Sequence, residues 1–289
     1  MNAKAETFLR SLEARRREKS KRKAFLRRLI FITASLLWVF RASTVFAFDH
    51  SPWDSLLKAH VVGGLVDYGG FLKDKNVLDQ YLNQVAHVPI EEFANESREN
   101  RIAAWINTYN ASVIRLILSV YPVDSVEKIH DFWNQKIVEI AGMRYSLKEV
   151  RENVFRRGFR DERATLALVS GTMSSGPLRI EAYEGPRLGE QLRDQMNVFL
   201  SDARFNRIGA RQKKLHLSPL FRELRDDFVL GYGLPEGGGR FSRAELAVLG
   251  FIRIHVSDPL VKEWISGRKY RLRYLPVDLS LNRTSGKSA

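Results

Sequence analysis

The chain of 289 residues contains no cysteine. No disulfide bond can stabilise it, so a hydrophobic core must do so alone. The absence also excludes a cysteine nucleophile and zinc bound by cysteine. Histidine is scarce, and the histidines at 50, 60, 87, 130, 216 and 255 show no paired helical spacing that predicts a zinc site. The sequence therefore predicts neither a metal site nor a cofactor.

The N-terminal region contains a short apolar run, Leu29–Phe40, whose twelve residues fall below the roughly 20 that cross a bilayer. Lysines and arginines precede the run, and small residues follow it as far as Ala47. This order is typical of a cleaved signal peptide, with cleavage between Ala47 and Phe48, and predicts a periplasmic or extracellular protein. An uncleaved inner-membrane anchor with its basic end in the cytoplasm is one alternative. A cytosolic protein with a basic helical arm is another.

Positive charge is concentrated in the same region. Residues 1–47 hold 12 Lys/Arg and 3 Asp/Glu, or +9 of the total +14. The other 242 residues hold 35 Lys/Arg and 30 Asp/Glu, a net charge of +5. This modest charge does not predict a nucleic-acid partner. The basic run at 204–214 is either a solvated face or a dock for an anionic lipid head group or an acidic partner.

Hydrophobic periodicity predicts short strands interleaved with helices and hairpins, which favours an α+β domain over a doubly wound parallel sheet. The helices are expected at 53–62, 77–85, 101–120, 124–127, 146–156, 188–200, 242–255 and 259–267, and the strands at 65–68, 136–140, 143–145, 166–169, 205–208, 214–217 and 270–274. Two patterns, Ser146 with Glu149 and Ser242 with Glu245, indicate capping boxes at helix starts.

Residues 161–179 are interpreted as a buried strand followed by a small-residue loop, the place where a hydrolase displays its nucleophile. The loop offers Ser170, Ser174 and Ser175, but no histidine lies within thirty residues on either side. It also lacks the Gly-x-Ser-x-Gly pattern of a nucleophile elbow. Serines that fill a tight turn are one interpretation, and a surviving serine nucleophile is the alternative.

Seven segments, taken together, resemble the domain-of-unknown-function family 547, a group of mostly exported bacterial proteins. In order they are FDHSPWDSLL at 48–57, GLVDY at 64–68, AWINTYNA at 104–111, YSL at 145–147, the loop at 161–179, LSPLF at 217–221 and YLPVDLSLN at 274–282. The resemblance implies one domain over 48–282, preceded by residues 1–47 and followed by a disordered tail at 283–289. It further implies a papain-like, cysteine-hydrolase-like fold, with helices around a small, mostly antiparallel sheet and hairpins.

The chain departs from the family pattern at its reactive positions. Typical members carry histidine at the position of Thr165, cysteines at those of Ser170 and Ser175, glutamate and histidine at those of Arg151 and Glu152, and often histidine at that of Arg115. A serine hydroxyl needs a well-placed general base before it can attack, and threonine cannot act as one. The resemblance therefore implies that cysteine-type hydrolysis is lost and that no catalytic residue remains.

A pocket could persist without the reaction. The candidates for its lining are Trp105, Asn107, Tyr109, Asn110, Arg115, Ser174 and Arg179. Hydrogen bonds to buried backbone are the favoured role for the two asparagines, core packing for the two aromatics, and a carboxylate partner for Arg179. The sequence thus predicts a non-catalytic binding or scaffold module with an unknown ligand or partner. A residual serine-dependent amide or ester hydrolase, with a base such as His130 or His216, is the alternative.

Overall fold

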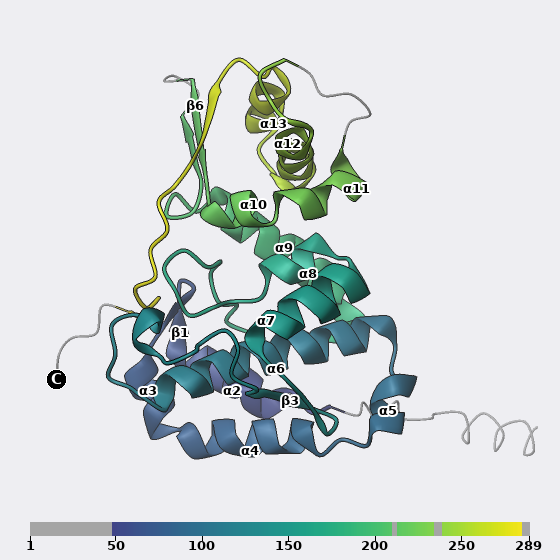
Figure 1. The fold of residues 1–289 in the computed structure, drawn as a ribbon, viewed down its shortest axis with the longest axis vertical. Helices are drawn as coiled ribbons and strands as arrows, with labels where there is room; N and C mark the ends of the chain where they lie inside the picture. The colour runs from purple at the N-terminus through teal and green to yellow at the C-terminus, as the bar shows by residue number, and fades with distance from the viewer. Residues whose placement is uncertain (1–47, 210–212, 234–238, 285–289) are drawn as a thin grey trace, which may run out of the picture. The chain divides into compact units, whose positions relative to one another are not determined.

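The computed structural model describes residues 48–209, 213–233 and 239–284 (Figure 1). In the first half the elements are α2 (Ser51–His60), β1 (Val61–Val62), β2 (Leu65–Val66), α3 (Tyr68–Lys73), α4 (Lys75–Ala86), α5 (Ile90–Asn95), α6 (Arg98–Leu118), η1 (Val126–Lys128), β3 (Val138–Ile140), β4 (Met143–Tyr145), α7 (Leu147–Glu149), the π-helix η2 (Val150–Phe159) and α8 (Glu162–Leu166). In the second half they are η3 (Gly185–Arg187), α9 (Leu188–Ser201), β5 (Arg207–Gly209), β6 (Lys214–Leu217), α10 (Pro219–Glu223), η4 (Arg225–Phe228), α11 (Val229–Tyr232), α12 (Arg243–His255), α13 (Pro259–Ser266) and β7 (Arg271–Tyr274).

The mixture of helices and strands confirms the α+β class. The strands of the described residues do not form one sheet, however. They form the antiparallel pairs β1–β2 and β3–β4, and a three-stranded sheet in which β6 pairs antiparallel with β5 and parallel with β7. No helix in the described part of the chain combines the length and hydropathy that a bilayer crossing requires. The run Leu29–Phe40 and the cleavage residue Ala47 lie outside the described residues.

Helix α6 is the centre of the first core, the apolar cluster formed mainly by residues 48–192 (Figure 1). Ser97 begins the helix by accepting the N–H of Asn100 at 3.1 Å. Its buried side chains run from Ile102 to Leu118 and occur on all sides of the helix. A helix that is buried on all sides is enclosed by other elements, and α3, α4, β3, η3 and α9 pack against it. The predicted helix at 101–120 is confirmed, with its start three residues earlier.

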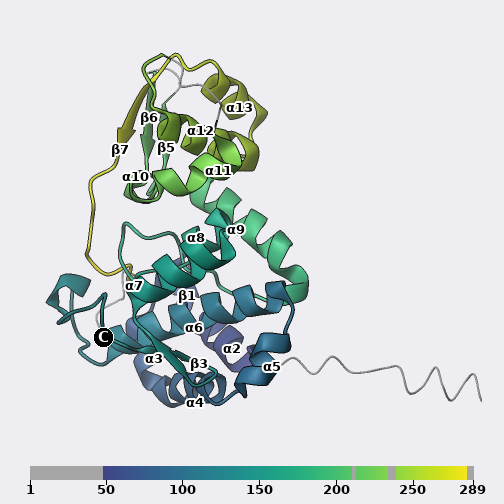
Figure 2. The same ribbon diagram turned by 45° about the vertical axis from the view of Figure 1, so that its right-hand side comes forward.

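A second core lies in the C-terminal part of the chain, where α12 packs on the aromatic residues of α10 and η4. The rings of Phe221, Phe228 and Phe251 have centroids 4.8–6.2 Å apart. Helix α9 joins the two cores, because Leu192 belongs to the first and Met196 to the second. Figure 2 shows α9 extending from the helices around α6 toward the second core.

The predicted strand at 166–169 is wrong. Asp161 accepts the N–H groups of Arg163 and Ala164 and thereby starts helix α8, which ends at Leu166. Residues 167–169 are buried but have no regular structure. A short buried apolar run does not distinguish a strand from a buried helix end, and the side chain of Asn110 on α6 bonds this backbone as a neighbouring strand would.

The described part of the chain ends as an extended segment, residues 275–284, here named the C-terminal strap (Figure 1). The strap leaves the three-stranded sheet where the N–H of Leu275 donates to the carbonyl of Leu217 at 2.8 Å. It then crosses to the first core, where the N–H of Asn282 donates to Gly171 and its carbonyl accepts the N–H of Val66. The strap therefore connects both cores through main-chain hydrogen bonds.

His50, which lies directly before α2, makes the stability of the folded state depend on pH. Its Nδ1 lies 2.9 Å from the hydroxyl of Tyr81, and burial lowers the pKa of His50 to about 4. Between that value and the ordinary value near 6.5 the unfolded chain binds the extra proton, so acidification favours unfolding. We expect this residue to remove up to about 3 kcal/mol of stability between pH 7 and pH 4. Urea unfolding of the wild type and of His50→Gln measures the difference, and His87→Gln at an exposed position is the control. Equal pH slopes for wild type and His50→Gln would contradict the prediction.

Candidate functional site

The serine-rich turn at 170–176 closes on itself. Ser170 Oγ lies 3.3 Å from Thr172 Oγ1, and the hydroxyl of Ser175 donates to the carbonyl of Thr172 at 2.7 Å. The N–H of Ser175 donates to Thr172 Oγ1 at 3.1 Å. Ser170 and Ser175 are only 6% and 3% exposed. Both hydroxyls at the family's cysteine positions are therefore engaged inside the turn and turned away from solvent.

Gly171 allows this turn to lie directly on α6. Its φ is +72°, and a Cβ at this position would stand 2.4 Å from Ile117 Cδ1 and 3.2 Å from the hydroxyl oxygen of Tyr68. Glycine is the residue that tolerates both the left-handed backbone and the close approach. The turn is consequently held in a form that keeps Ser170 and Thr172 in the interior.

In the described part of the chain, no histidine is hydrogen-bonded to the loop hydroxyls. Thr165, at the family's histidine position, uses its hydroxyl to bond the carbonyl of Asp161 at 3.2 Å within α8. All six histidines lie in the described part of the chain, and no hydrogen bond joins any of them to a loop serine. His60 instead pairs with Asp74 at 2.7 Å. The two histidines named as alternative bases, at 130 and 216, have no side-chain hydrogen bond there.

Two buried asparagines of α6, Asn107 and Asn110, hold backbone groups of the segment that follows α8. Asn110 Nδ2 donates to the carbonyl of Ala167 at 3.2 Å, and its Oδ1 accepts the N–H of Val169 at 2.8 Å. Asn107 bonds the N–H and the carbonyl of Tyr183 in the same manner, at 2.9 and 2.8 Å. These are the backbone bonds that the sequence favours for them, and they position the loop rather than a substrate.

Trp105 and Tyr109 are both buried in the first core. The Trp105 ring meets the edges of Phe93 and Tyr145 at centroid distances of 6.1 and 5.2 Å. Burial raises the pKa of Tyr109 to about 12, and the nearby Arg151 opposes that rise. Phe48, at the predicted cleavage point, is buried against Phe93 with a centroid distance of 5.4 Å.

Arg151 and Glu152, at the family's glutamate and histidine positions, belong to η2. Arg151 is buried, donates to Glu223 Oε1 at 2.8 Å and lies 5.5 Å above the Trp133 ring. Glu152 pairs with Arg156 at 2.8 Å. Both side chains therefore make ion pairs, and Arg151 links η2 to α10.

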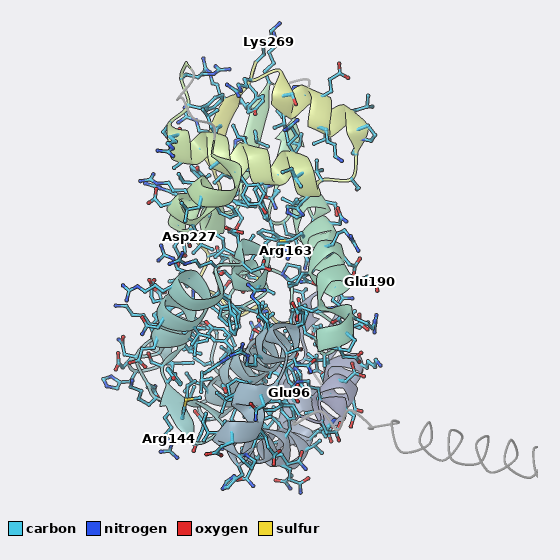
Figure 3. The ribbon with its side chains drawn as sticks, turned by 90° about the vertical axis from the view of Figure 1, so that its right-hand side faces the viewer. Glu96, Arg144, Arg163, Glu190, Asp227 and Lys269 are labelled. Atoms are coloured by element: carbon cyan, nitrogen blue, oxygen red, sulfur yellow. The ribbon has the colours of Figure 1, made fainter. Side chains whose placement is uncertain are left out.

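Ion pairs also occur where η2 and α8 face the second core, and Figure 3 shows Arg163 and Asp227 in this zone. Arg163 pairs with Asp161 at 2.7 Å, and Asp227 accepts from Arg156 at 2.7 Å. Burial raises the pKa of the Asp161 carboxyl, but the Arg163 guanidinium and the N–H bonds of α8 lower it below its ordinary value overall. These pairs satisfy charges at the boundary of the two cores.

The last two candidates lie apart from the loop serines. Arg115 pairs with Asp79 on α4. Arg179 pairs with Glu181 and with Asp194, the latter at 2.7 Å, and its guanidinium lies 6.0 Å from the Tyr183 ring centroid. Each arginine thus has a carboxylate partner. Of the predicted lining residues, Ser174 alone borders the cavity described next.

A cavity of about 320 Å³ lies beside the serine-rich turn, between it, the start of the strap and the β5 region. Its apolar wall comprises Met173, Phe205, Pro219, Leu275 and Pro276. Phe205 is buried, and its ring centroid lies 5.5 Å from that of Phe199 in the second core. The cavity therefore has a wall fixed by core packing.

Polar groups also line this cavity. Ser174 Oγ accepts the N–H of Asp278 at 2.6 Å, and the N–H of Ser174 donates to the Asp278 carbonyl at 3.1 Å. Arg204 pairs with Asp202 and donates to the carbonyl of Gly63 at 2.7 Å. Arg207 uses its Nε to bond the carbonyl of Ala203 at 3.1 Å. The lining thus combines the hydroxyls of Ser174 and Ser218, two guanidiniums and one carboxylate.

Sequence reasoning missed most of this lining. The signals were present, since the cavity brings together the loop at 161–179 and the segments at 217–221 and 274–282. Each segment carries part of the family resemblance, and the basic run at 204–214 contributes Arg204 and Arg207. Their convergence on one cavity becomes evident in the structure alone, because they lie far apart in the chain.

A second cavity, of about 460 Å³, lies among α11, α12 and α13 and includes no residue singled out by the sequence. In the described residues, no three side chains of histidine, aspartate or glutamate gather closely enough to hold a metal ion. The cavity beside Ser174 is therefore the candidate site.

Comparisons with known proteins bear on the same loop. A search of curated proteins and a search of solved structures each returned no significant match. Residues 93–200 match a family model described as a protein of unknown function, DUF547. The matched segment includes α6, the serine-rich turn and all but the last residue of α9. The resemblance to the DUF547 family is thus confirmed over residues 93–200.

Proposed function

We propose that this protein is a binding module that keeps a papain-like frame and has lost the hydrolytic reaction of that frame. The cavity beside Ser174 is its ligand site. The main support for this proposal is that the hydroxyls of Ser170 and Ser175 are both buried and hydrogen-bonded to Thr172. An attacking oxygen must reach the substrate and transfer its proton to a base within hydrogen-bond distance. Neither condition is met at these two positions.

The alternative is a residual serine-dependent amide or ester hydrolase. One observation favours it: Ser174 is half-buried, lines the cavity and accepts rather than donates its observed hydrogen bond. Its hydroxyl proton is therefore free to be transferred. The hydrolase still needs a base, and nucleophile and base act as a unit in such enzymes.

Turnover assays decide between the two functions. We expect full-length protein to hydrolyse 4-nitrophenyl esters and aminoacyl amides no faster than a Ser170→Ala/Ser174→Ala/Ser175→Ala triple variant does. Ser201→Ala, an exposed serine on α9, is the matched control, and thermal unfolding shows that each variant is folded. Activity that Ser174→Ala abolishes and Ser201→Ala preserves would establish the hydrolase.

We further propose export with removal of residues 1–47. The order of basic, apolar and small residues before Phe48 supports it. Intact mass of the protein isolated from the periplasm of its host should correspond to a chain that starts at Phe48. A full-length mass from the membrane fraction would support the anchor instead.

A further inference from the structure

We propose that the cavity beside Ser174 binds a monocarboxylate that carries an apolar substituent. This inference rests on the binding role proposed above and names the ligand class of that site. It follows from three properties of the lining: its apolar wall, its unused hydrogen-bond donors and its charge balance.

The apolar wall of the cavity determines the kind of substituent that the ligand should carry. Met173, Phe205, Pro219, Leu275 and Pro276 offer no charged group to the cavity, and burial of an apolar surface against them is favourable. The volume of about 320 Å³ corresponds to roughly ten water molecules at about 30 Å³ each. A group the size of a phenyl ring with a short linker fits this space.

Hydrogen-bond donors of the lining that have no acceptor determine which polar group the ligand should carry. Ser174 Oγ receives a hydrogen bond from the Asp278 N–H, so its own proton has no acceptor in the described structure. The Nη atoms of Arg207 make no hydrogen bond or ion pair there, because its observed bond uses Nε. A planar guanidinium fork together with a hydroxyl matches the geometry of a carboxylate.

Charge balance limits the ligand to one negative charge. Asp202 already neutralises Arg204 through a bidentate contact. Asp278 also lines the cavity, although its Oδ1 is turned back to accept the N–H of Ser280 at 3.0 Å. Among the described lining residues, Arg207 is then the one cation without a carboxylate partner, and the Asp278 carboxylate belongs to the same lining. A doubly charged phosphate would meet repulsion that a monocarboxylate largely avoids.

Methionine labelling tests the proposal with internal controls. The described residues contain Met143, Met173 and Met196, of which Met173 lines the cavity. Full-length protein labelled at the methionine methyls, with assignments from Met→Leu variants, is titrated with 3-phenylpropanoate, its amide, the matching alcohol, acetate and inorganic phosphate. We expect the acid to shift the Met173 signal saturably and to leave Met143 and Met196 unchanged. The amide, the alcohol and acetate should each bind at least about 10-fold more weakly.

Arg207→Gln should reduce the affinity for 3-phenylpropanoate about 10-fold and leave that for the alcohol unchanged. Arg271→Gln, an exposed arginine on β7, is the matched control and should change neither. Equal binding of acid and alcohol, tighter binding of phosphate, or no shift of Met173 with the acid would each overturn the ligand class. The proposed function fails through a different readout, namely turnover that depends on a loop serine.

Discussion

A chain that stops after Val277 should not fold into a stable protein. The truncation removes most of the C-terminal strap, whose main-chain groups bond both sides of the first core. The N–H groups of Leu281 and Asn282 donate to Asp124 and Gly171 at 2.9 and 3.0 Å, and the Asn282 carbonyl accepts the N–H of Val66 at 2.8 Å. The strap also supplies the acceptor for the buried hydroxyl of Tyr68, at 2.7 Å.

The size of the loss follows from ordinary magnitudes. Each of these hydrogen bonds contributes about 1 kcal/mol net, and an unpaired buried group costs about 1–3 kcal/mol. Leu281, which is 3% exposed, adds about 2 kcal/mol of apolar burial. The sum approaches the total stability of a typical domain, about 5–15 kcal/mol. We therefore expect no cooperative urea transition in tryptophan fluorescence.

Two further chains make this test specific. A stop after Thr284 retains the strap and should unfold like the wild type. Leu281→Ala should be intermediate, with a loss of about 2–4 kcal/mol. If the chain ending at Val277 unfolds cooperatively at the wild-type midpoint, the strap does not contribute to the stability of the fold.

Features that depend on a few neighbouring residues could be predicted from the sequence. Both capping boxes, Ser146 with Glu149 and Ser242 with Glu245, are present with their reciprocal bonds. The hairpin of β3 and β4 lies where alternating residues around a glycine turn predict it. Helix α6 lies where the three-to-four-residue spacing of apolar side chains predicts it. In each case the partner residues are within a turn of helix or across a tight turn, so the local pattern carries the information.

Features that depend on distant partners were missed or misassigned. The run at 166–169 was predicted as a strand because its apolar residues suggest burial, and burial is correct. Its backbone partner is a side chain 57 residues away, which no local pattern reveals. The cavity is similar, since Ser174 and Asp278 meet across 104 residues. The π-helical form of η2, which runs to Phe159, is likewise not predicted, because a capping box indicates only where a helix begins.

Asn110→Ala should destabilise the protein by about 2–5 kcal/mol. The variant leaves the N–H of Val169 and the carbonyl of Ala167 unpaired in the first core, and each buried group without a partner costs about 1–3 kcal/mol. Urea unfolding measures the loss. Asn134→Ala removes an exposed amide that bonds Asp131, and as the matched control it should change stability by no more than about 0.5 kcal/mol.

The same variant tests whether α6 positions the candidate site. Residues 167–169 lead directly into the turn that carries Met173 and Ser174, so release of this backbone should move the Met173 methyl signal even without ligand. Met143, in the β3–β4 hairpin, should keep its position. If Asn110→Ala lowers stability yet leaves the Met173 signal in place, the asparagine supports the core and the strap alone fixes the turn. If both the stability and the Met173 signal change, α6 positions the candidate site through Asn110, whose side chain makes the backbone hydrogen bonds that a neighbouring strand would otherwise make.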